Sequence, residues 1–257
     1  MNLDQSLIKE VNIIVQKAGK IIMSHWGKPL NFHYKPNAGF STPADIESEN
    51  FIIEELKKID STIPFWAEEA GKSQDNSDWY WVIDPLDGTT NFAHNIAYFC
   101  ISIALTYKSV PQLGVIYDPL HDELFIAYKD GGATMNGKSI KVNSPSLEYA
   151  IVAISLPYVC STNFNDCFKH IIKVINSVAD VRFMGSTALD LAYVAAGRFD
   201  GTFFQELKWW DVAAGVIILQ EAGALVSDFE KKPINDQFQT FLAASPKVYD
   251  KIMNLLQ

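Results

Sequence analysis

The sequence predicts an α+β fold built from layers of helices and sheets. Apolar residues recur every three or four positions between Leu7 and Ile22, which is the stripe of an amphipathic helix. Residues 63–128 instead form short runs rich in aromatic and β-branched residues, which favour strands. Strand and helix patterns alternate from residue 150 onward. Helices first, strands next and alternation last indicate stacked sheets and helices rather than a plain βαβ repeat.

Two helices are expected in the N-terminal segment. The first ends at Gly27-Lys28-Pro29, and the second begins at Thr42-Pro43, where Thr42 can cap the helix and proline suits its first turn. Asp45 lies in that first turn and faces the free amides. Residues 31–41 are polar and contain glycine and proline, so we expect a loop long enough to be a mobile lid.

The remaining elements follow in order along the chain. Strands are expected over 64–67, 79–83, 99–107, 112–117, 123–128, 150–156, 200–204 and 241–244. Helices are expected over 165–178, 187–196 and 212–222, with a last helix from Ser245-Pro246 and a hairpin turn at Asn136-Gly137. No repeat or low-complexity linker divides the chain. We expect a single domain over residues 1–257, which allows a subdivision near residue 145 into a metal and phosphate half and a substrate half.

The composition is that of a globular protein and not of a nucleic-acid-binding protein. Hydrophobic residues make up 48% and charged residues 20% of the 257 residues, which excludes disordered, collagen-like and disulfide-scaffold classes. The net charge of −9 has the wrong sign for neutralising nucleic-acid phosphates, although a local basic patch stays open. An acidic protein that handles an anion usually needs a cation between the two, so a bound metal ion is expected.

Cysteine usage and hydropathy favour a cytoplasmic protein. Cys100, Cys160 and Cys167 are odd in number and form no CxxC pair, which argues against a disulfide framework or a zinc cluster. The N-terminus shows no basic segment followed by an apolar one, and no apolar run approaches the roughly 20 residues of a membrane span. We therefore expect neither export nor a membrane anchor.

The most informative stretch is residues 81–92, which read Trp-Val-Ile-Asp-Pro-Leu-Asp-Gly-Thr-Thr-Asn-Phe. We expect a buried strand to end at Asp84, Pro85 to stiffen a turn, and Asp87 to return a second carboxylate to the same point. Mg²⁺ prefers carboxylate oxygens and completes its octahedron with water and substrate phosphate. Gly88-Thr89-Thr90 has the sequence of a helix start whose backbone amides could hold phosphate oxygens. The stretch therefore predicts adjoining metal and phosphate sites.

The spacing of this motif excludes an aspartate-nucleophile phosphatase. In those enzymes the nucleophile lies two residues before the second aspartate. Pro85 occupies that position here, and proline cannot form an acyl phosphate. Any hydrolysis should therefore use water activated by a metal ion.

Other acidic residues can complete a metal centre. Glu68-Glu69 follows a short expected strand, and Asp211 follows two tryptophans in an apolar neighbourhood, where a buried carboxylate needs a cation. Each also has a plain structural interpretation, because paired glutamates often end a solvated loop and Asp211 is a good N-cap for the helix that follows. Asp45 can cap its own helix or accept a hydrogen bond that orients the Thr89 hydroxyl.

Four motifs together resemble the signatures of the inositol monophosphatase family. They are Ala67-Glu68-Glu69, the run from Asp84 to Phe92, the run from Gly185 to Gly197, and the run from Trp210 to Gly215. They follow the family order, and the match extends from Thr42 to Gly223. The resemblance implies a layered α-β-α-β-α fold of the inositol monophosphatase and fructose-1,6-bisphosphatase type, usually in a homodimer. It also implies hydrolysis of a small phosphate monoester with Mg²⁺, often inhibited by Li⁺.

The resemblance further implies the metal ligands, which are Glu68, Asp84, the Leu86 carbonyl, Asp87 and Asp211. Asp84 would bridge two ions, and Glu68 would also reach a third, weaker ion or its water. Thr89, backed by Asp45, would orient the attacking water on the first ion, while the second ion would stabilise the leaving alkoxide. Two or three Mg²⁺ ions per subunit are thus expected, with Mn²⁺ as the alternative.

The same resemblance implies a substrate site. Its residues would be Asp87, Gly88, Thr89, Thr90, Arg182, Gly185, Ser186, Thr187, Glu206 and Asp211. The amides of Gly88 and Thr89 would hold the phosphate. Lys35 falls in the loop where family members place a lysine near the metal ions, and Arg182 faces the substrate, a subunit partner or solvent.

Two positions depart from the family pattern where it would name the substrate. Family members that act on inositol phosphate usually carry a glutamate seven residues before the last metal aspartate, and Phe204 occupies that position here. Thr187 stands where alanine is common beside the inositol ring. Either Glu206 substitutes for the missing glutamate through a shifted strand end, or the natural substrate is not inositol phosphate.

The expected function is Mg²⁺-dependent hydrolysis of a small phosphate monoester, with inositol-1-phosphate first among the candidates. Fructose-1,6-bisphosphate, histidinol phosphate and 3′-phosphoadenosine 5′-phosphate are alternatives with the same chemistry; the last is the least supported, because the nucleotide-specific members usually have a longer chain. A different class of function is a binding or regulatory protein that keeps this fold, either without catalysis or beside it. Lost metal ligands or an added basic patch would favour that class, and the sequence shows neither.

Overall fold

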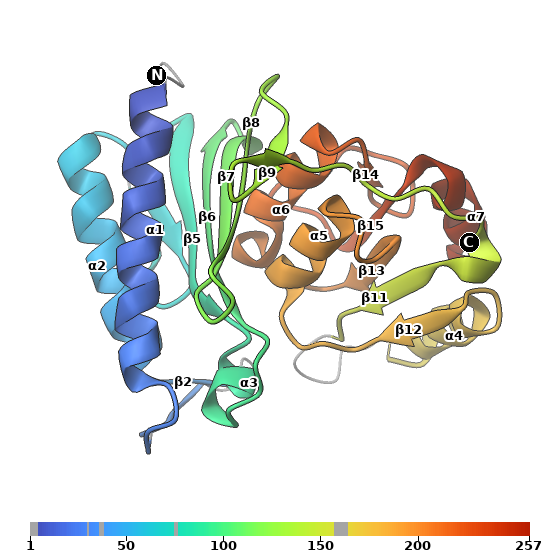
Figure 1. Cartoon of the computed structure of the whole chain (residues 1–257), viewed down its shortest axis with the longest axis horizontal. Coiled ribbons are helices and arrows are strands. Elements are labelled where there is room, and N and C mark those ends of the chain that lie inside the picture. Colours follow the sequence, from blue (N-terminus) through green and yellow to red (C-terminus); the bar gives the residue numbers. More distant parts are fainter. Residues whose placement is uncertain (1–4, 30, 36–38, 75–76, 157–163) are drawn as a thin grey trace.

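The computed structural model describes residues 5–29, 31–35, 39–74, 77–156 and 164–257, without the side chains of 164–167. Its elements stack in five layers, in the order helices, sheet, helices, sheet, helices (Figure 1). The expected layered α-β-α-β-α fold is therefore confirmed.

The first two layers are a helix pair and a sheet of eight strands. The helices α1 (Gln5–His25) and α2 (Pro43–Ile59) cover one face of the sheet. The sheet order is β10-β9-β8-β7-β6-β5-β3-β4, antiparallel except for the parallel pair β3 and β5. Its strands are β3 (Phe65–Ala67), β4 (Gly71–Lys72), β5 (Trp79–Asp87), β6 (Cys100–Tyr107), β7 (Val110–Asp118), β8 (Glu123–Tyr128), β9 (Ala133–Met135) and β10 (Lys138–Ser139).

The middle layer consists of two helices buried between the sheets. Nearly every residue of α5 (Thr187–Ala195) and α6 (Trp209–Glu221) is buried. A helix that is apolar on all sides needs neighbours on all sides, and these two helices pack between both sheets. Among the described residues, the side chains of this layer and residues of both sheets form the largest hydrophobic cluster.

The second sheet has five strands in the order β12-β11-β13-β15-β14. Its strands are β11 (Ile151–Ile154), β12 (Asp180–Arg182), β13 (Gly201–Gln205), β14 (Leu225–Ser227) and β15 (Thr240–Ala244). The helices α4 (Phe164–Ile175) and α7 (Pro246–Leu256) cover its outer face. Smaller elements are the hairpin β1 (His33–Lys35) and β2 (Gly39–Ser41), the short helix α3 (Thr89–Ala93) and the 3-10 helix η1 (Leu147–Tyr149).

Several element boundaries differ from the sequence-based expectation. The segment expected as a loop at 31–41 contains the paired strands β1 and β2. The helix expected from residue 212 begins earlier, at Trp209, and the strands β4, β12 and β14 were not expected. These strands are two or three residues long, so they carry too little pattern to be recognised without their neighbours. None of the helices in the described part of the chain combines the length and hydropathy that a transmembrane span requires.

Candidate active site

A bulge in β5 brings two aspartates of the central motif together. Asp84 pairs with Ser102 on β6, and Asp87 pairs with Cys100. The two positions are three residues apart on β5 but two apart on β6, so β5 contains one extra residue between them. Residues three apart in a regular strand point to opposite faces, and the extra residue of a bulge turns the second one back. The turn expected at Pro85 is therefore wrong; the strand continues through it to Asp87.

The chain then turns sharply at Gly88 into α3. Gly88 has φ +91°, and a Cβ there would lie 3.0 Å from the carbonyl oxygen of Tyr98, so only glycine fits. The Thr89 hydroxyl lies 2.9 Å from Asp45 Oδ1 and 2.9 Å from the Leu86 carbonyl oxygen. Its single proton can be donated to one acceptor at a time, and the two acceptors together fix the position of the hydroxyl oxygen.

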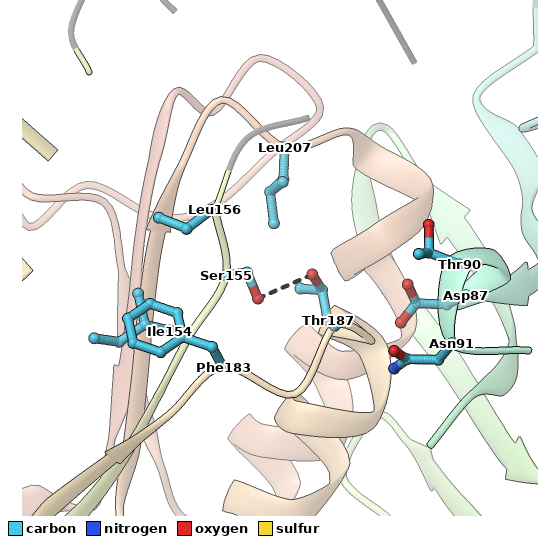
Figure 2. Close-up of a pocket in the computed structure, with 10 residues that line it drawn as sticks. Asp87, Thr90, Asn91, Ile154, Ser155, Leu156, Phe183, Thr187 and Leu207 are labelled. Atoms are coloured by element: carbon cyan, nitrogen blue, oxygen red, sulfur yellow. Dashed lines mark hydrogen bonds between the residues drawn. The ribbon is translucent and has the colours of Figure 1, made fainter. Parts of the chain in front are cut away.

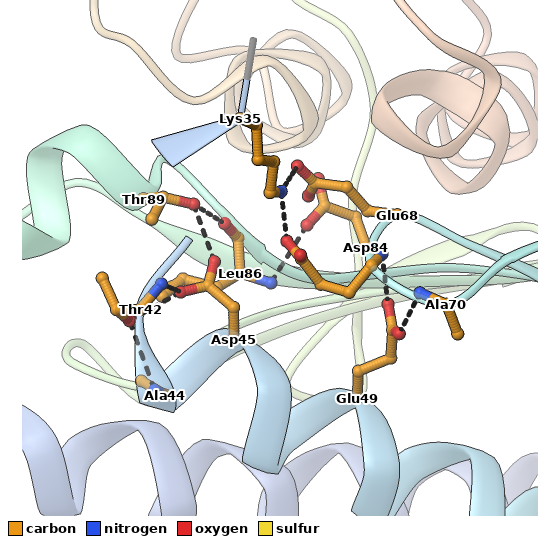
Figure 3. A network of polar contacts seen from close by, with 11 residues as sticks. Lys35, Thr42, Ala44, Asp45, Glu49, Glu68, Ala70, Asp84, Leu86 and Thr89 are labelled. Atoms are coloured by element: carbon orange, nitrogen blue, oxygen red, sulfur yellow. Dashed lines mark hydrogen bonds and ion pairs between the residues drawn. The ribbon is translucent and has the colours of Figure 1, made fainter. Parts of the chain in front are cut away.

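Asp45 both caps α2 and holds Thr89. Its Oδ2 accepts hydrogen bonds from the Thr42 amide at 2.8 Å and the Thr42 hydroxyl at 2.6 Å, while Oδ1 faces Thr89. Asp45 therefore fills both roles that the sequence left as alternatives, since Oδ2 caps the helix and Oδ1 accepts from the Thr89 hydroxyl. Burial raises the pKa of Asp45 to about 6, and the hydrogen bonds from Thr42 and Thr89 oppose that rise. Figure 3 shows this network beneath the β5 bulge.

A second buried carboxylate of α2, Glu49, supports the segment that carries Glu68. Its two oxygens accept hydrogen bonds from the amides of Glu69 at 2.9 Å and Ala70 at 2.7 Å. Burial raises the pKa of Glu49 to about 7 against the effect of these two bonds. Sequence reasoning missed Glu49, although its spacing of four residues from Asp45 places both on one helix face.

The hairpin β1–β2 places Lys35 against the glutamate pair. The Lys35 ammonium donates a hydrogen bond to Glu68 Oε1 at 2.9 Å and another to Glu69 (Figure 3). Burial lowers the pKa of Lys35, but the charges and hydrogen bonds of Glu68 and Glu69 outweigh burial and leave it raised. Lys35 therefore contacts both glutamates, while its expected place near bound metal ions stays a prediction.

Asp211 reaches the same region from α6. The helix begins at Trp209, so Asp211 lies in its first turn and is not the N-cap that the sequence suggested. Its carboxylate reaches back to accept a hydrogen bond from the Lys208 amide at 2.8 Å. The side chain is buried, with 6% of its surface exposed.

Four carboxylates, three from the eight-stranded sheet and its loop and one from α6, share one electrostatic neighbourhood. Burial raises the pKa of Asp84 well above its usual range, and the negative charges of Glu68, Asp87 and Asp211 raise it further. As the side chains stand, no group of three or more His, Cys, Asp and Glu residues among the described ones is arranged to hold an ion. The donor set nevertheless fits a hard divalent cation, because buried carboxylates that repel one another are stabilised by a cation between them.

Asp87 also connects this cluster to α5. Its Oδ2 accepts hydrogen bonds from the Ser186 hydroxyl at 2.7 Å and the Ala188 amide at 2.6 Å. Burial raises the pKa of Asp87 to about 6, and these hydrogen bonds act in the opposite direction. Ser186 therefore lies behind Asp87 and holds it, rather than facing the cavity described next.

A cavity of about 270 Å³ opens beside Asp87 (Figure 2). Its lining residues are Asp87, Thr90, Asn91, Ile154, Ser155, Leu156, Phe183, Gly185, Thr187 and Leu207. The Thr187 hydroxyl donates a hydrogen bond to Ser155 Oγ at 3.1 Å. The sequence predicted Asp87, Thr90, Gly185 and Thr187 among the substrate residues, and it did not predict Asn91, Ser155 or the apolar lining residues.

Six residues expected at the substrate are absent from the described lining, namely Gly88, Thr89, Arg182, Ser186, Glu206 and Asp211. Arg182 forms an ion pair with Asp180 at 2.5 Å and donates to the Val181 carbonyl oxygen. Glu206 is half-buried with φ +59° and is absent from the described lining, and its replacement of the missing glutamate stays a prediction. Phe204 is 1% exposed and stacks on Phe241 with ring centroids 4.5 Å apart.

Comparisons with known proteins agree with this fold. The inositol monophosphatase family model matches residues 3–257. A Nus factor SuhB from Pasteurella multocida is 38% identical over 94% of this chain and 92% of its own. An inositol-1-monophosphatase from Rhizobium meliloti is 38% identical over 86% of this chain and 85% of its own length. The crystal structure of the extragenic suppressor protein suhB from Bartonella henselae matches this fold with a TM-score of 0.94 and 33% sequence identity. The match covers 98% of this chain and 99% of that one. The chain therefore belongs to the inositol monophosphatase family and is a phosphoric monoester hydrolase.

Proposed function

We propose that the chain hydrolyses a small phosphate monoester with water activated by Mg²⁺ ions. The observation that carries this proposal is the convergence of Asp84, Asp87 and Asp211 on the β5 bulge, beside the Thr89–Asp45 pair. Family members are generally metal-dependent. The name of the Rhizobium meliloti relative makes inositol-1-phosphate the first substrate to test. Fructose-1,6-bisphosphate and histidinol phosphate remain alternatives.

The proposed ion ligands are Glu68, Asp84, the Leu86 carbonyl, Asp87 and Asp211. Bound ions would supply a water of lowered pKa and positive charge beside the leaving oxygen. Thr89 donates its proton to Asp45 or to Leu86, which leaves lone pairs of its oxygen free to accept a hydrogen bond from water. The amides of Gly88 and Thr89 are proposed to hold the phosphate, since the φ of +91° at Gly88 turns the chain there without a side chain in the way.

A phosphate-release assay with inositol-1-phosphate and glycerol-2-phosphate tests the proposal. Activity should appear with Mg²⁺, disappear with EDTA, and fall when Li⁺ is added. Asp87→Asn should lower kcat by about 1,000-fold or more, because an amide cannot supply the negative charge that a divalent cation needs. Its melting curve should stay close to that of the parent, since the amide oxygen can still accept the bonds from Ser186 and Ala188. Parent-like activity in this variant would contradict the mechanism.

A second function beside catalysis is favoured by one observation, the name Nus factor SuhB carried by a 38% identical relative. If the chain also acts through binding, the inactive Asp87→Asn variant should restore growth in a strain that lacks the protein. If growth follows phosphatase activity across variants, catalysis alone accounts for the role.

We further propose that the chain forms a homodimer and works in the cytoplasm. The apolar side chains of Phe168, Ile172 and Ile175 on α4 are 39%, 57% and 45% exposed, which supports a partner surface there. Light scattering measures the mass directly, and a mass near 28.8 kDa at micromolar concentration would argue against the dimer.

A further inference from the structure

The cavity beside Asp87 has two chemically different walls. On one side lie Asp87, Thr90 and Asn91, which come from the end of β5 and from α3. On the other side lie Ile154, Leu156, Phe183 and Leu207. The hydroxyl pair of Ser155 and Thr187 lies between them (Figure 2). A phosphate ester whose phosphate is held at the proposed metal and phosphate site beside Asp87 would direct the far end of its alcohol toward the apolar side chains.

The described lining also restricts the charge of the alcohol. Asp87 is the only ionisable residue among the ten that line the cavity. A second phosphate would need a basic partner there, and the neighbouring Arg182 is already paired with Asp180. An ammonium or imidazolium group would need a carboxylate of its own, whereas Asp87 already accepts bonds from Ser186 and Ala188. An uncharged alcohol therefore fits best.

The same lining disfavours a fully hydroxylated ring. Phe204 takes the position of the family's sugar-binding glutamate, and its side chain stacks on Phe241 in the core. Distal hydroxyls placed against Phe183 and Leu207 would lose water without gaining a hydrogen-bond partner. Hydrocarbon at the same place would instead gain contact with these side chains.

From these walls we propose that the natural substrate is the phosphate monoester of an uncharged alcohol whose far end is apolar, selected by Phe183 and Leu207. This inference rests on the proposed phosphatase function. It names the substrate class of the same site and ranks bisphosphates, cationic esters and cyclitol phosphates below such an ester.

Two esters of the same ring size test the proposal. Cyclohexyl phosphate and inositol-1-phosphate share a six-membered ring, and only the second carries further hydroxyls. Their KM values are compared with Mg²⁺ present, because kcat also reflects the acidity of the leaving alcohol. We expect the KM of cyclohexyl phosphate to be at least about 10-fold lower. An equal or lower KM for inositol-1-phosphate would overturn the proposal.

A substitution in the apolar wall separates specificity from general damage. Phe183 is 51% exposed, so Phe183→Ser should leave the melting temperature nearly unchanged. We expect it to raise the KM of cyclohexyl phosphate about 10-fold and that of inositol-1-phosphate less than about 3-fold. Tyr149→Ser is the matched control, since Tyr149 is an exposed aromatic residue before the opposite end of β11. An equal effect of Phe183→Ser on both esters would overturn the assignment.

The outcome also separates this inference from the function on which it rests. Hydrolysis of glycerol-2-phosphate without hydrolysis of cyclohexyl phosphate would overturn the substrate class and leave the phosphatase intact. Mg²⁺-dependent hydrolysis of none of these esters would overturn both.

Discussion

Lys35 supplies positive charge to the glutamate pair from a strand of only three residues, β1. A divalent cation bound by Glu68 would compete with the lysine for the same carboxylate oxygens. Lys35→Met should therefore increase the affinity for Mg²⁺ several-fold, measured by calorimetric titration. The variant should also melt about 2–4 °C lower in EDTA, because removing one partner of a part-buried ion pair costs about 1 kcal/mol.

Lys28→Met is the control for this prediction, since Lys28 is exposed beyond the end of α1. Lys28→Met should change neither the affinity for Mg²⁺ nor the melting temperature in EDTA. Unchanged or weaker Mg²⁺ affinity in Lys35→Met would show that the lysine and the ion do not compete.

The buried carboxyls also predict how stability depends on pH without metal. Burial raises the pKa of Asp45 and Asp87 to about 6 and that of Glu49 to about 7. The folded chain therefore holds more protons than the unfolded chain between the usual carboxyl pKa values and about pH 7. The free energy of unfolding must then fall as pH rises through that interval.

Melting curves in EDTA at pH 5.5 and pH 7.5 measure this effect. We expect the melting temperature to be about 5 °C lower at the higher pH. Saturating Mg²⁺ should remove or reverse the trend, because the ion binds the deprotonated carboxylates. A melting temperature in EDTA that rises across this interval would contradict the raised pKa values.

At the scale of elements, α2 is the support on which the acidic site is built. One face of this helix carries Asp45, Ser48 and Glu49, all buried. Asp45 holds Thr89, Ser48 donates to the Pro85 carbonyl oxygen at 3.2 Å, and Glu49 holds the segment after Glu68. These spacings of three and four residues place the side chains under the β5 bulge together.

Glu49→Gln tests this support. The backbone amides of Glu69 and Ala70 each donate to one carboxylate oxygen of Glu49. A glutamine has one oxygen for these two amides, and its NH2 group would face one of them donor to donor. We expect Mg²⁺ affinity and kcat/KM to fall about 10-fold or more, as for other residues that orient metal ligands. Glu47→Gln is the matched control, because Glu47 lies on the same helix with a side chain 57% exposed. Equal behaviour of the two variants would remove Glu49 from the site.

Local chemistry made part of this site predictable. Asp84, Asp87 and Thr89 lie within six residues, and Thr42 with Asp45 forms a capping pattern that needs no distant partner. The bulge in β5 could not be predicted, because register depends on the pairing with β6. The apolar wall of the cavity could not be predicted either. Its residues come from β11 and the residues just after it, from the segment after β12 and from the segment after β13, and only the fold brings them together.

At the scale of the whole molecule, the helices α5 and α6 connect the two sheets through one core. Buried residues of the eight-stranded sheet, such as Val82 and Ile116, belong to the same hydrophobic cluster as Phe204 and Phe241 of the five-stranded sheet. A boundary near residue 145 would separate sheets that share this cluster. The packing therefore predicts one cooperative unfolding transition and not two.

Urea unfolding followed by far-ultraviolet circular dichroism and by tryptophan fluorescence tests this prediction, because all six tryptophans lie outside the five-stranded sheet. At a fixed protein concentration, the two signals should change over the same range of urea concentration. Ile217→Ala, in the buried face of α6, should shift both midpoints equally, with a loss of about 2–4 kcal/mol for the cavity it leaves. Dichroism that persists after the fluorescence change is complete would mean that the five-stranded sheet folds on its own. In that case the acidic cluster, to which α6 contributes Asp211, would be assembled by docking of two halves and not by one folding event.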